Sequence, residues 1–122
     1  MIVAGFGMRA AASLVDLTQA LSGLPAHPQL LATLRAKGET EVFQSFASSQ
    51  NLATCLLEED EIAGIETPTR SSRILARFGT GSLAEAAALV AARRHGTARL
   101  IHPRHISTDG LVTVALAEVH PQ

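Results

Sequence analysis

The sequence is poor in aromatic residues and contains a single cysteine. It has four Phe and neither Trp nor Tyr, so recognition of nucleic-acid bases by aromatic stacking is not expected. The formal net charge is −1, whereas nucleic-acid-binding domains usually carry a basic excess. Because Cys55 has no second cysteine to pair with, no internal disulfide can form. It lies in the apolar run LATCLL and is interpreted as a buried strand residue rather than a nucleophile.

Long apolar runs are also missing. No run reaches the roughly 18 residues that a membrane-spanning helix needs. The opening MIVAGFG lacks the basic segment of a signal peptide, and glycines interrupt its apolar run at once. We therefore expect a cytoplasmic protein that has neither a membrane nor a nucleic acid as its partner.

Short apolar runs alternate with helical patterns along the chain, which is 47% hydrophobic. Runs typical of strands cover residues 1–4, 30–34, 52–57, 98–103 and 111–119. Amphipathic or capped helical patterns cover residues 12–21, 39–51 and 81–96, with helical turns in 58–65 and 66–79. This order predicts one domain over residues 1–122. We expect a three-layer α/β/α domain with a mixed, mostly parallel sheet of about five strands that ends in an antiparallel hairpin.

Three local features define the boundaries of these elements. Residues 30–34 fit either a helix or a strand, and the α/β alternation favours the strand because a helix would leave the sheet small. Thr69 is a plausible N-cap for the helical turn that follows it. Asp109–Gly110 is a strong turn signal, and the short connection makes the last two strands antiparallel neighbours.

A glycine pair precedes the clearest helix. Gly79 and Gly81 flank Thr80, and Ser82 with Glu85 has the spacing of a capping box. Backbone N–H groups at a helix start attract anions, and glycines let a ligand approach closely. The loop is neither a Walker loop, since it has no lysine, nor a dinucleotide fingerprint. On the motif alone, a plain helix cap is favoured over an anion site.

A second glycine pair follows the first predicted strand. Gly5 and Gly7 flank Phe6, and Arg9 comes shortly afterwards. In a parallel α/β sheet, both glycine loops would lie at the carboxyl edge of the strands, where such folds bind ligands. The alternative is that the glycines allow tight packing of the strand against a helix, and the residues leave both interpretations open.

Taken together, these segments resemble the CobE/CbiG C-terminal-domain family. VAGFGMRAAAS is similar to the family's V-x-G-x-G-C-R opening, with Met8 in place of the cysteine. GTGSLAEAAAL matches the G-x-G-S-x-x-E-A-A-A-L signature, and LVTVALAEV matches the final V-T-x-A-I-A strand. The lead-in ETPTRSSRILARFG also matches. The resemblance runs along essentially the whole chain in the expected order.

The resemblance implies a role in cobalamin (vitamin B12) biosynthesis. In the family, the domain occurs at the C-terminal end of cobalt-precorrin-5A hydrolase and as a stand-alone protein of the aerobic route, which the 122-residue chain resembles. It implies a corrinoid or precorrin intermediate as partner, and no cofactor is expected. Whether the chain is an enzyme stays open: it could carry the intermediate, act on it as a hydrolase or isomerase, or dock onto another pathway enzyme.

The chemistry of such a ligand selects a set of candidate residues. Corrin precursors carry acetate and propionate carboxylates around an apolar macrocycle. Helix N-termini and arginines suit the carboxylates, and an apolar wall suits the ring. The expected ligand-binding residues are Gly5, Gly7, Arg9, Gly79, Thr80, Gly81, Ser82 and Arg104. No catalytic residue is assigned, and Ser82 could equally be only a helix cap.

Histidines and acidic residues give further candidates. His102 and His105 stand three apart around Pro103, but no Cys/His cluster completes a zinc site, so no metal site is expected. Either histidine could be an axial ligand or acid–base group near the ring, or a residue of a surface loop. The acids of residues 58–61 are interpreted as a solvated helix start. Glu85 is either a general base or, preferably, the partner in the cap of its own helix.

Overall fold

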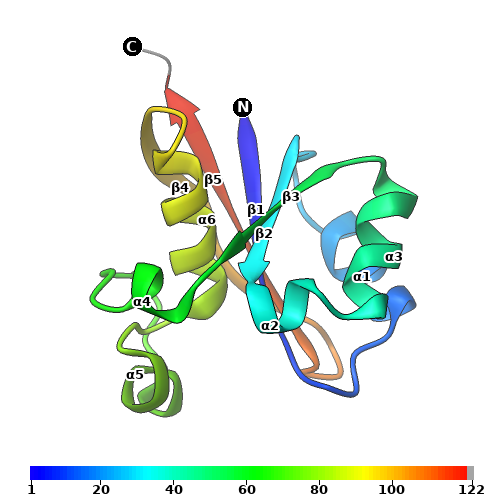
Figure 1. The fold of residues 1–122 in the computed structure, drawn as a ribbon, viewed down its shortest axis with the longest axis horizontal. Coiled ribbons are helices and arrows are strands. Elements are labelled where there is room, and N and C mark those ends of the chain that lie inside the picture. Colours follow the sequence, from blue (N-terminus) through cyan, green and yellow to red (C-terminus); the bar gives the residue numbers. More distant parts are fainter. Residues whose placement is uncertain (121–122) are drawn as a thin grey trace.

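The computed structural model describes residues 1–120, and these residues form one five-stranded mixed sheet (Figure 1). The strands are β1 (Ile2–Met8), β2 (Leu30–Leu34), β3 (Ala53–Leu57), β4 (Thr97–Ile106) and β5 (Val112–His120), in the spatial order β3-β2-β1-β5-β4. β2 is parallel to β1 and β3, whereas β5 is antiparallel to β1 and β4. The carboxyl ends of β1 to β4 therefore share one edge of the sheet with the amino end of β5.

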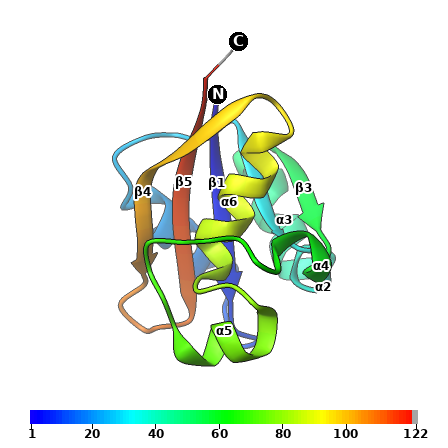
Figure 2. The same cartoon turned by 90° about the vertical axis from the view of Figure 1, so that its left-hand side faces the viewer.

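Helices cover both faces of this sheet. They are α1 (Leu14–Ser22), α2 (Arg35–Gly38), α3 (Glu41–Gln50), α4 (Glu59–Ile62), α5 (Ser72–Phe78) and α6 (Leu83–Arg93). α1 and α3 lie on one face and α6 on the other (Figures 1 and 2). The three-layer α/β/α class, the mixed sheet, the terminal hairpin and the strand over residues 30–34 are thus confirmed.

The face that α1 and α3 cover is built around three phenylalanines. Phe6 of β1 packs edge-to-face against Phe43 and Phe46 of α3, with ring centroids 5.8 and 5.5 Å away. Leu17 of α1 and Leu31 of β2 complete this core. Alternate residues of the central strands point to opposite faces, so the same strands supply the second core beneath α6.

The second core depends on the close approach of α6 to β1. A Cβ atom on Gly5 would lie 2.1 Å from the carbonyl oxygen of Ala84 and 2.4 Å from the amide nitrogen of Ala88. Both values are far inside van der Waals contact, so only glycine fits there. Most of α6 is buried alanine, and these small side chains let the helix lie close to the sheet. Gly5 therefore serves tight strand-to-helix packing, one of the two alternatives raised above.

The first strand is longer than predicted. β1 continues through Gly5 and Gly7 to Met8, so this glycine pair lies within the strand and not in a loop after it. The reason is the neighbouring strand: β5 pairs with β1 along its whole length, from Ile2 opposite Glu118 to Met8 opposite Val112. Antiparallel pairing of this kind holds an extended backbone even where the residue is glycine.

β4 ends at a later residue than predicted, and α5 has a different N-cap. β4 extends beyond Pro103 to Ile106, so residues 104–106 are not part of a connecting loop. Proline is tolerated because β4 is an edge strand whose register shifts on both sides of His102. The N-cap of α5 is Ser71 rather than Thr69.

No single helix of residues 1–120 is long and apolar enough to cross a membrane. α5 and α6 reach that length and composition only when taken together, as a pair bent by 52°. The apolar character of α6 is accounted for by its burial against the sheet.

Replacing Gly5 by Ala tests the role of this contact. Because the added methyl group would meet the backbone of α6, we expect G5A to lower the free energy of unfolding by about 3 kcal/mol, measured by urea denaturation. Gly23→Ala is the matched control: its Cβ would lie 3.7 Å from the nearest atoms at an ordinary φ of −76°, so its effect should stay within about 1 kcal/mol. Equal stability of G5A and wild type would contradict this packing.

Candidate functional site

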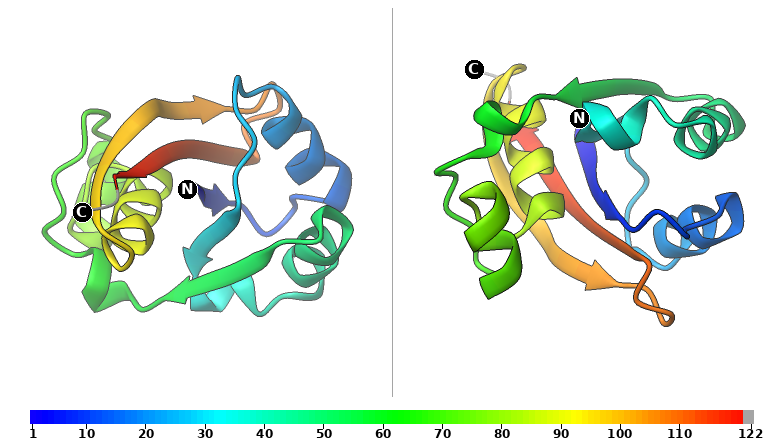
Figure 3. Two further views of the ribbon diagram at one scale, coloured as in Figure 1. Left: turned by 90° about the horizontal axis from the view of Figure 1, so that it is seen from above. Right: turned by 60° about the horizontal axis from the view of Figure 1, so that its bottom comes forward.

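A cleft of about 630 Å³ opens at the edge of the sheet where β1 and β4 end and β5 begins. The right-hand view of Figure 3 brings this edge forward, with α5 (yellow-green), α2 (cyan) and the β4–β5 hairpin (orange) arranged around the end of β1 (blue). The N-terminus of α6 also reaches the cleft, through Ser82 and Leu83. The cleft thus lies at the carboxyl edge at which α/β folds commonly bind ligands.

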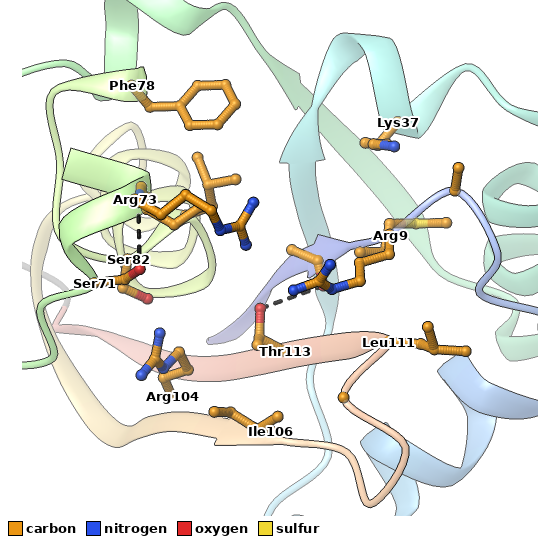
Figure 4. A pocket seen from close by; sticks show the side chains of 16 residues that line it. Arg9, Lys37, Ser71, Arg73, Phe78, Ser82, Arg104, Ile106, Leu111 and Thr113 are labelled. Atoms are coloured by element: carbon orange, nitrogen blue, oxygen red, sulfur yellow. Dashed lines mark hydrogen bonds between the residues drawn. The ribbon is translucent and has the colours of Figure 1, made fainter. Parts of the chain in front are cut away.

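Four cationic side chains line the cleft, each from a different part of the chain. Arg9 directly follows β1, Lys37 lies in α2, Arg73 in α5 and Arg104 in β4. Figure 4 shows the guanidinium groups of Arg9 and Arg73 directed into the space between the two sides of the cleft. None of the described residues that line it is Asp or Glu. The cleft is therefore a concentration of positive charge in a chain whose formal net charge is −1.

The cations of the cleft differ in their ion pairing from most other arginines. Outside the cleft, Arg35 pairs with Glu58, Arg77 with Glu59, Arg94 with Glu61 and Arg99 with Glu118. The exposed Arg70 and Arg93 are the exceptions there within residues 1–120. Within residues 1–120, the side chains of Arg9, Lys37, Arg73 and Arg104 form no ion pair. Lys37 and Arg104 are only partly exposed. Unpaired charges of one sign that face a common space favour an anion with several charges.

Apolar side chains fill the spaces between these cations. Ile74 and Phe78 of α5 and Leu83 of α6 form one side of the cleft, and Ile106 and Leu111 lie on the hairpin side. Ile106 is 49% exposed, although it is a large apolar residue. Apolar walls with a few placed polar groups are typical of sites for small molecules and cofactors. The arrangement suits a ligand with an apolar body and an acidic periphery.

A buried glutamate holds two of the surrounding segments in place. Glu85 of α6 is fully buried, and its Oε1 accepts a hydrogen bond from the backbone N–H of Thr69 at 3.0 Å. Its Oε2 accepts one from Thr69 Oγ1 at 2.8 Å and one from the backbone N–H of Arg104 at 2.7 Å. Arg104 stands at a register shift of β4, so its N–H is bound by Glu85. The carboxyl group thereby joins α6, β4 and the segment before α5.

These contacts confirm the cap at the start of α6 and correct the prediction of a complete capping box. Ser82 does cap the helix, since its Oγ accepts from the backbone N–H of Glu85 at 3.3 Å. The Glu85 side chain does not return to the N-cap, so the capping box is incomplete. The reason is that Thr69 and Arg104 offer three donors to the buried carboxyl group. Glu85 does not line the cleft, which gives no support to a role as general base.

The loop of Gly79 and Gly81 faces the protein rather than the cleft. Gly79 ends α5 in the left-handed conformation, with φ of 76°. Thr80 is buried, and its hydroxyl donates to the carbonyl of Ile65 at 2.7 Å. A Cβ on Gly81 would lie 2.7 Å from Thr69 O. These residues therefore pack the loop against residues 64–70.

The structure divides the expected ligand-binding set into two groups. Gly7, Arg9, Ser82 and Arg104 line the cleft, whereas Gly5, Gly79, Thr80 and Gly81 do not. Sequence reasoning missed Lys37, Arg73 and Phe78, which also line it. Arg73 and Phe78 lie in the lead-in segment RSSRILARF, whose family match could have drawn attention to them. Lys37 lies in the one-turn helix α2, and no motif of the sequence connects that segment with the cleft.

The histidines lie outside the cleft. His102 Nδ1 is 2.8 Å from the carbonyl oxygen of Pro103, and the rings of His102 and His105 are 6.4 Å apart. His105 faces a smaller cavity of about 230 Å³, which Asp16 and Asp109 also line. The Leu111 N–H and the Ser107 hydroxyl donate to Asp109 and hold its pKa below the ordinary value. Within residues 1–120, no three metal-ligating side chains gather in one place.

Cys55 and the acidic residues of α4 lie in or directly after β3, the outer strand on the opposite side of the sheet from β4. Cys55 is in β3 as predicted, but it is half-buried rather than buried. Burial raises the pKa of its thiol, while Arg94 acts in the opposite direction. Arg94 also pairs with Glu61, whose pKa the Glu58 N–H and Arg94 hold below its ordinary value. These groups stabilise α4 and the C-terminal end of α6.

Comparisons with known proteins agree on one family. The family described as Cobalamin synthesis G C-terminus matches residues 2–117. CobE, a protein from the cobalamin biosynthetic pathway, superposes with a TM-score of 0.83 at 23% identity, over 100% of this chain and 92% of that one. The cobalamin biosynthesis protein chiG from Agrobacterium tumefaciens superposes with a TM-score of 0.73 at 26% identity, over 98% of each chain. A search of curated proteins gave no match.

Replacing Glu85 by Gln tests whether this residue holds the cleft together. The amide has one acceptor oxygen where the carboxyl group has two, so at least one backbone N–H would lose its partner. We expect E85Q to lower the free energy of unfolding by about 2 kcal/mol or more, measured by urea denaturation. Glu66→Gln is the control, because Glu66 is exposed and its loss should change stability by less than about 0.5 kcal/mol. Similar stabilities of the two variants would contradict the conclusion that Glu85 holds the cleft together.

Proposed function

Because this chain belongs to the Cobalamin synthesis G C-terminus family, and is thus a cobalamin biosynthesis protein, we propose that its cleft binds a corrin-ring precursor. In this proposal the protein carries the precursor and delivers it within the aerobic pathway, to another enzyme of that pathway. The observation that carries the proposal is a cleft to which residues 1–120 contribute four cations without ion-pair partners and no carboxylate.

The dimensions and the chemistry of the cleft support this ligand. A volume of about 630 Å³ lies within the range of small-molecule and cofactor sites. The macrocycle of a corrin precursor would lie against Phe78 and Leu83, and its acetate and propionate groups would meet Arg9, Arg73 and Arg104. Arginine suits carboxylates because its planar guanidinium donates two parallel hydrogen bonds to them.

The residues that line the cleft favour a carrier over an enzyme. Among the described residues that do so, none is Asp, Glu, His or Cys, which are the usual acids, bases and nucleophiles. The hydroxyl of Ser82 is used in the cap of α6. Lys37 is the remaining ionisable group besides the arginines, and no carboxylate or imidazole among the described lining residues is present to act with it. The residues thus offer mainly charge and apolar surface, which hold a ligand.

An absorbance titration with metal-free and cobalt-containing corrin precursors tests the proposal, followed by mass analysis of the recovered ligand. We expect a saturable complex that returns the ligand with unchanged mass. A changed mass would contradict carriage and identify an enzyme, with the mass difference naming the reaction class. No binding of any precursor would contradict the proposal and favour a docking role.

Two arginine variants show whether the ligand occupies this cleft. Arg9→Ala removes a cation that lines it, and we expect the affinity to fall about tenfold, equivalent to about 1.4 kcal/mol. Arg93→Ala is the matched control, because Arg93 is exposed near the end of α6 and outside the cleft, and its affinity should equal that of wild type. Unchanged affinity of R9A would remove Arg9 from the site.

A further inference from the structure

We infer that the cleft selects a corrin precursor whose peripheral carboxylates are still free acids, and that it discriminates against the same ring once those groups have become amides. This inference rests on the proposed function and adds the charge state of the ligand. Its basis is the joint presence of Arg9, Lys37, Arg73 and Arg104 in one cleft without any acidic residue.

The first argument is charge balance. Each carboxylate that meets one of the four cations offsets a positive charge that the protein leaves unpaired. An amide carries no charge and would leave the cation without an anionic partner. The cation donates a charge-assisted hydrogen bond to either group, but only the carboxylate adds the Coulomb attraction between two opposite charges, so the acid form gains more from the same contacts.

The second argument is hydrogen-bond direction. Arginine and lysine side chains donate hydrogen bonds and accept none, so they suit the acceptor-only carboxylate. The NH₂ group of an amide needs an acceptor, and the cleft offers few. Ser82 Oγ already accepts from Glu85 N–H at 3.3 Å, and Ser71 Oγ accepts from Ile74 N–H at 3.4 Å. An amide NH₂ directed at a guanidinium would place donor against donor.

The third argument is partial burial. Lys37 and Arg104 are only partly exposed, and the surrounding wall contains Ile74, Phe78 and Leu83. A bound macrocycle would exclude further water from these cations. Partly buried ion pairs are screened less by salt than exposed ones. The stronger electrostatic attraction of the acid would therefore appear as a higher binding affinity than that of the amide.

This selectivity gives the protein a place in a reaction sequence. The bound ligand still carries its carboxylates, so any reaction that condenses ammonium with one of these carboxylates, giving an amide and water, comes after this protein in the sequence. Each such step removes one negative charge from the ligand and one ionic contact with the cleft. Amide formation by a later enzyme would therefore also weaken rebinding of the product.

Two corrins with the same ring provide the test. The probes are dicyanocobyrinic acid, which carries free carboxylates, and dicyanocobinamide, which carries amides in their place. Both have cyanide on the two axial positions of cobalt, so axial ligation does not distinguish them. We expect the acid to bind at least about tenfold more tightly at low salt, by absorbance titration or calorimetry, and the difference to shrink as salt screens the charges.

Glutamine variants connect this preference to the cleft. Arg73→Gln and Arg104→Gln should each weaken binding of the acid severalfold and leave binding of the amide nearly unchanged. Arg93→Gln, outside the cleft, should leave both affinities at their wild-type values. Equal affinity for the two probes, or tighter binding of the amide, would overturn this inference and leave the proposed corrin binding intact. Binding of neither probe would overturn both.

Discussion

The buried carboxyl group of Glu85 is the contact on which the geometry of the cleft depends. A buried polar group is costly unless it is hydrogen-bonded, and Glu85 meets that requirement with three donors from Thr69 and Arg104. Thr69 comes just before α5, which carries Arg73 into the cleft, and Arg104 is itself a lining residue. One side chain of the core helix therefore positions a cation of β4 and the segment that leads to a cation of α5.

The second constraint is the close contact between α6 and β1. Gly5 and the alanines of α6 let the helix backbone lie against the strand, and this brings Ser82 and Leu83 to the edge where β1 ends. The glycine-rich loop before α6 has a similar purpose, because Gly81 packs against Thr69. Small residues in the two family motifs thus serve packing, and the packing sets the position of the side chains that face the cleft.

Local patterns in the sequence predict most of the fold, and half of the residues expected at the site do line the cleft. Short apolar runs predict the strands, and the Asp109–Gly110 turn predicts the hairpin. Both features can be predicted because they depend on residues that are close together in the sequence. The partners of Glu85 stand 16 and 19 residues away, so its local spacing to Ser82 predicted a capping box instead. Lys37 and Arg73 likewise line the same cleft as Arg9 only because α2 and α5 are arranged around the same edge of the sheet. No local sequence pattern predicts that arrangement.

The most direct test of corrin binding in this cleft is a crystal structure of the protein with a bound corrin precursor. The prediction is that the macrocycle lies between α5 and the β4–β5 hairpin, against Phe78 and Leu83. Ligand carboxylates should lie within hydrogen-bonding distance of Arg9, Arg73 and Arg104, and the ligand should be chemically unchanged. A precursor bound elsewhere on the chain, or held in the cleft with its carboxylates directed away from these cations, would contradict it.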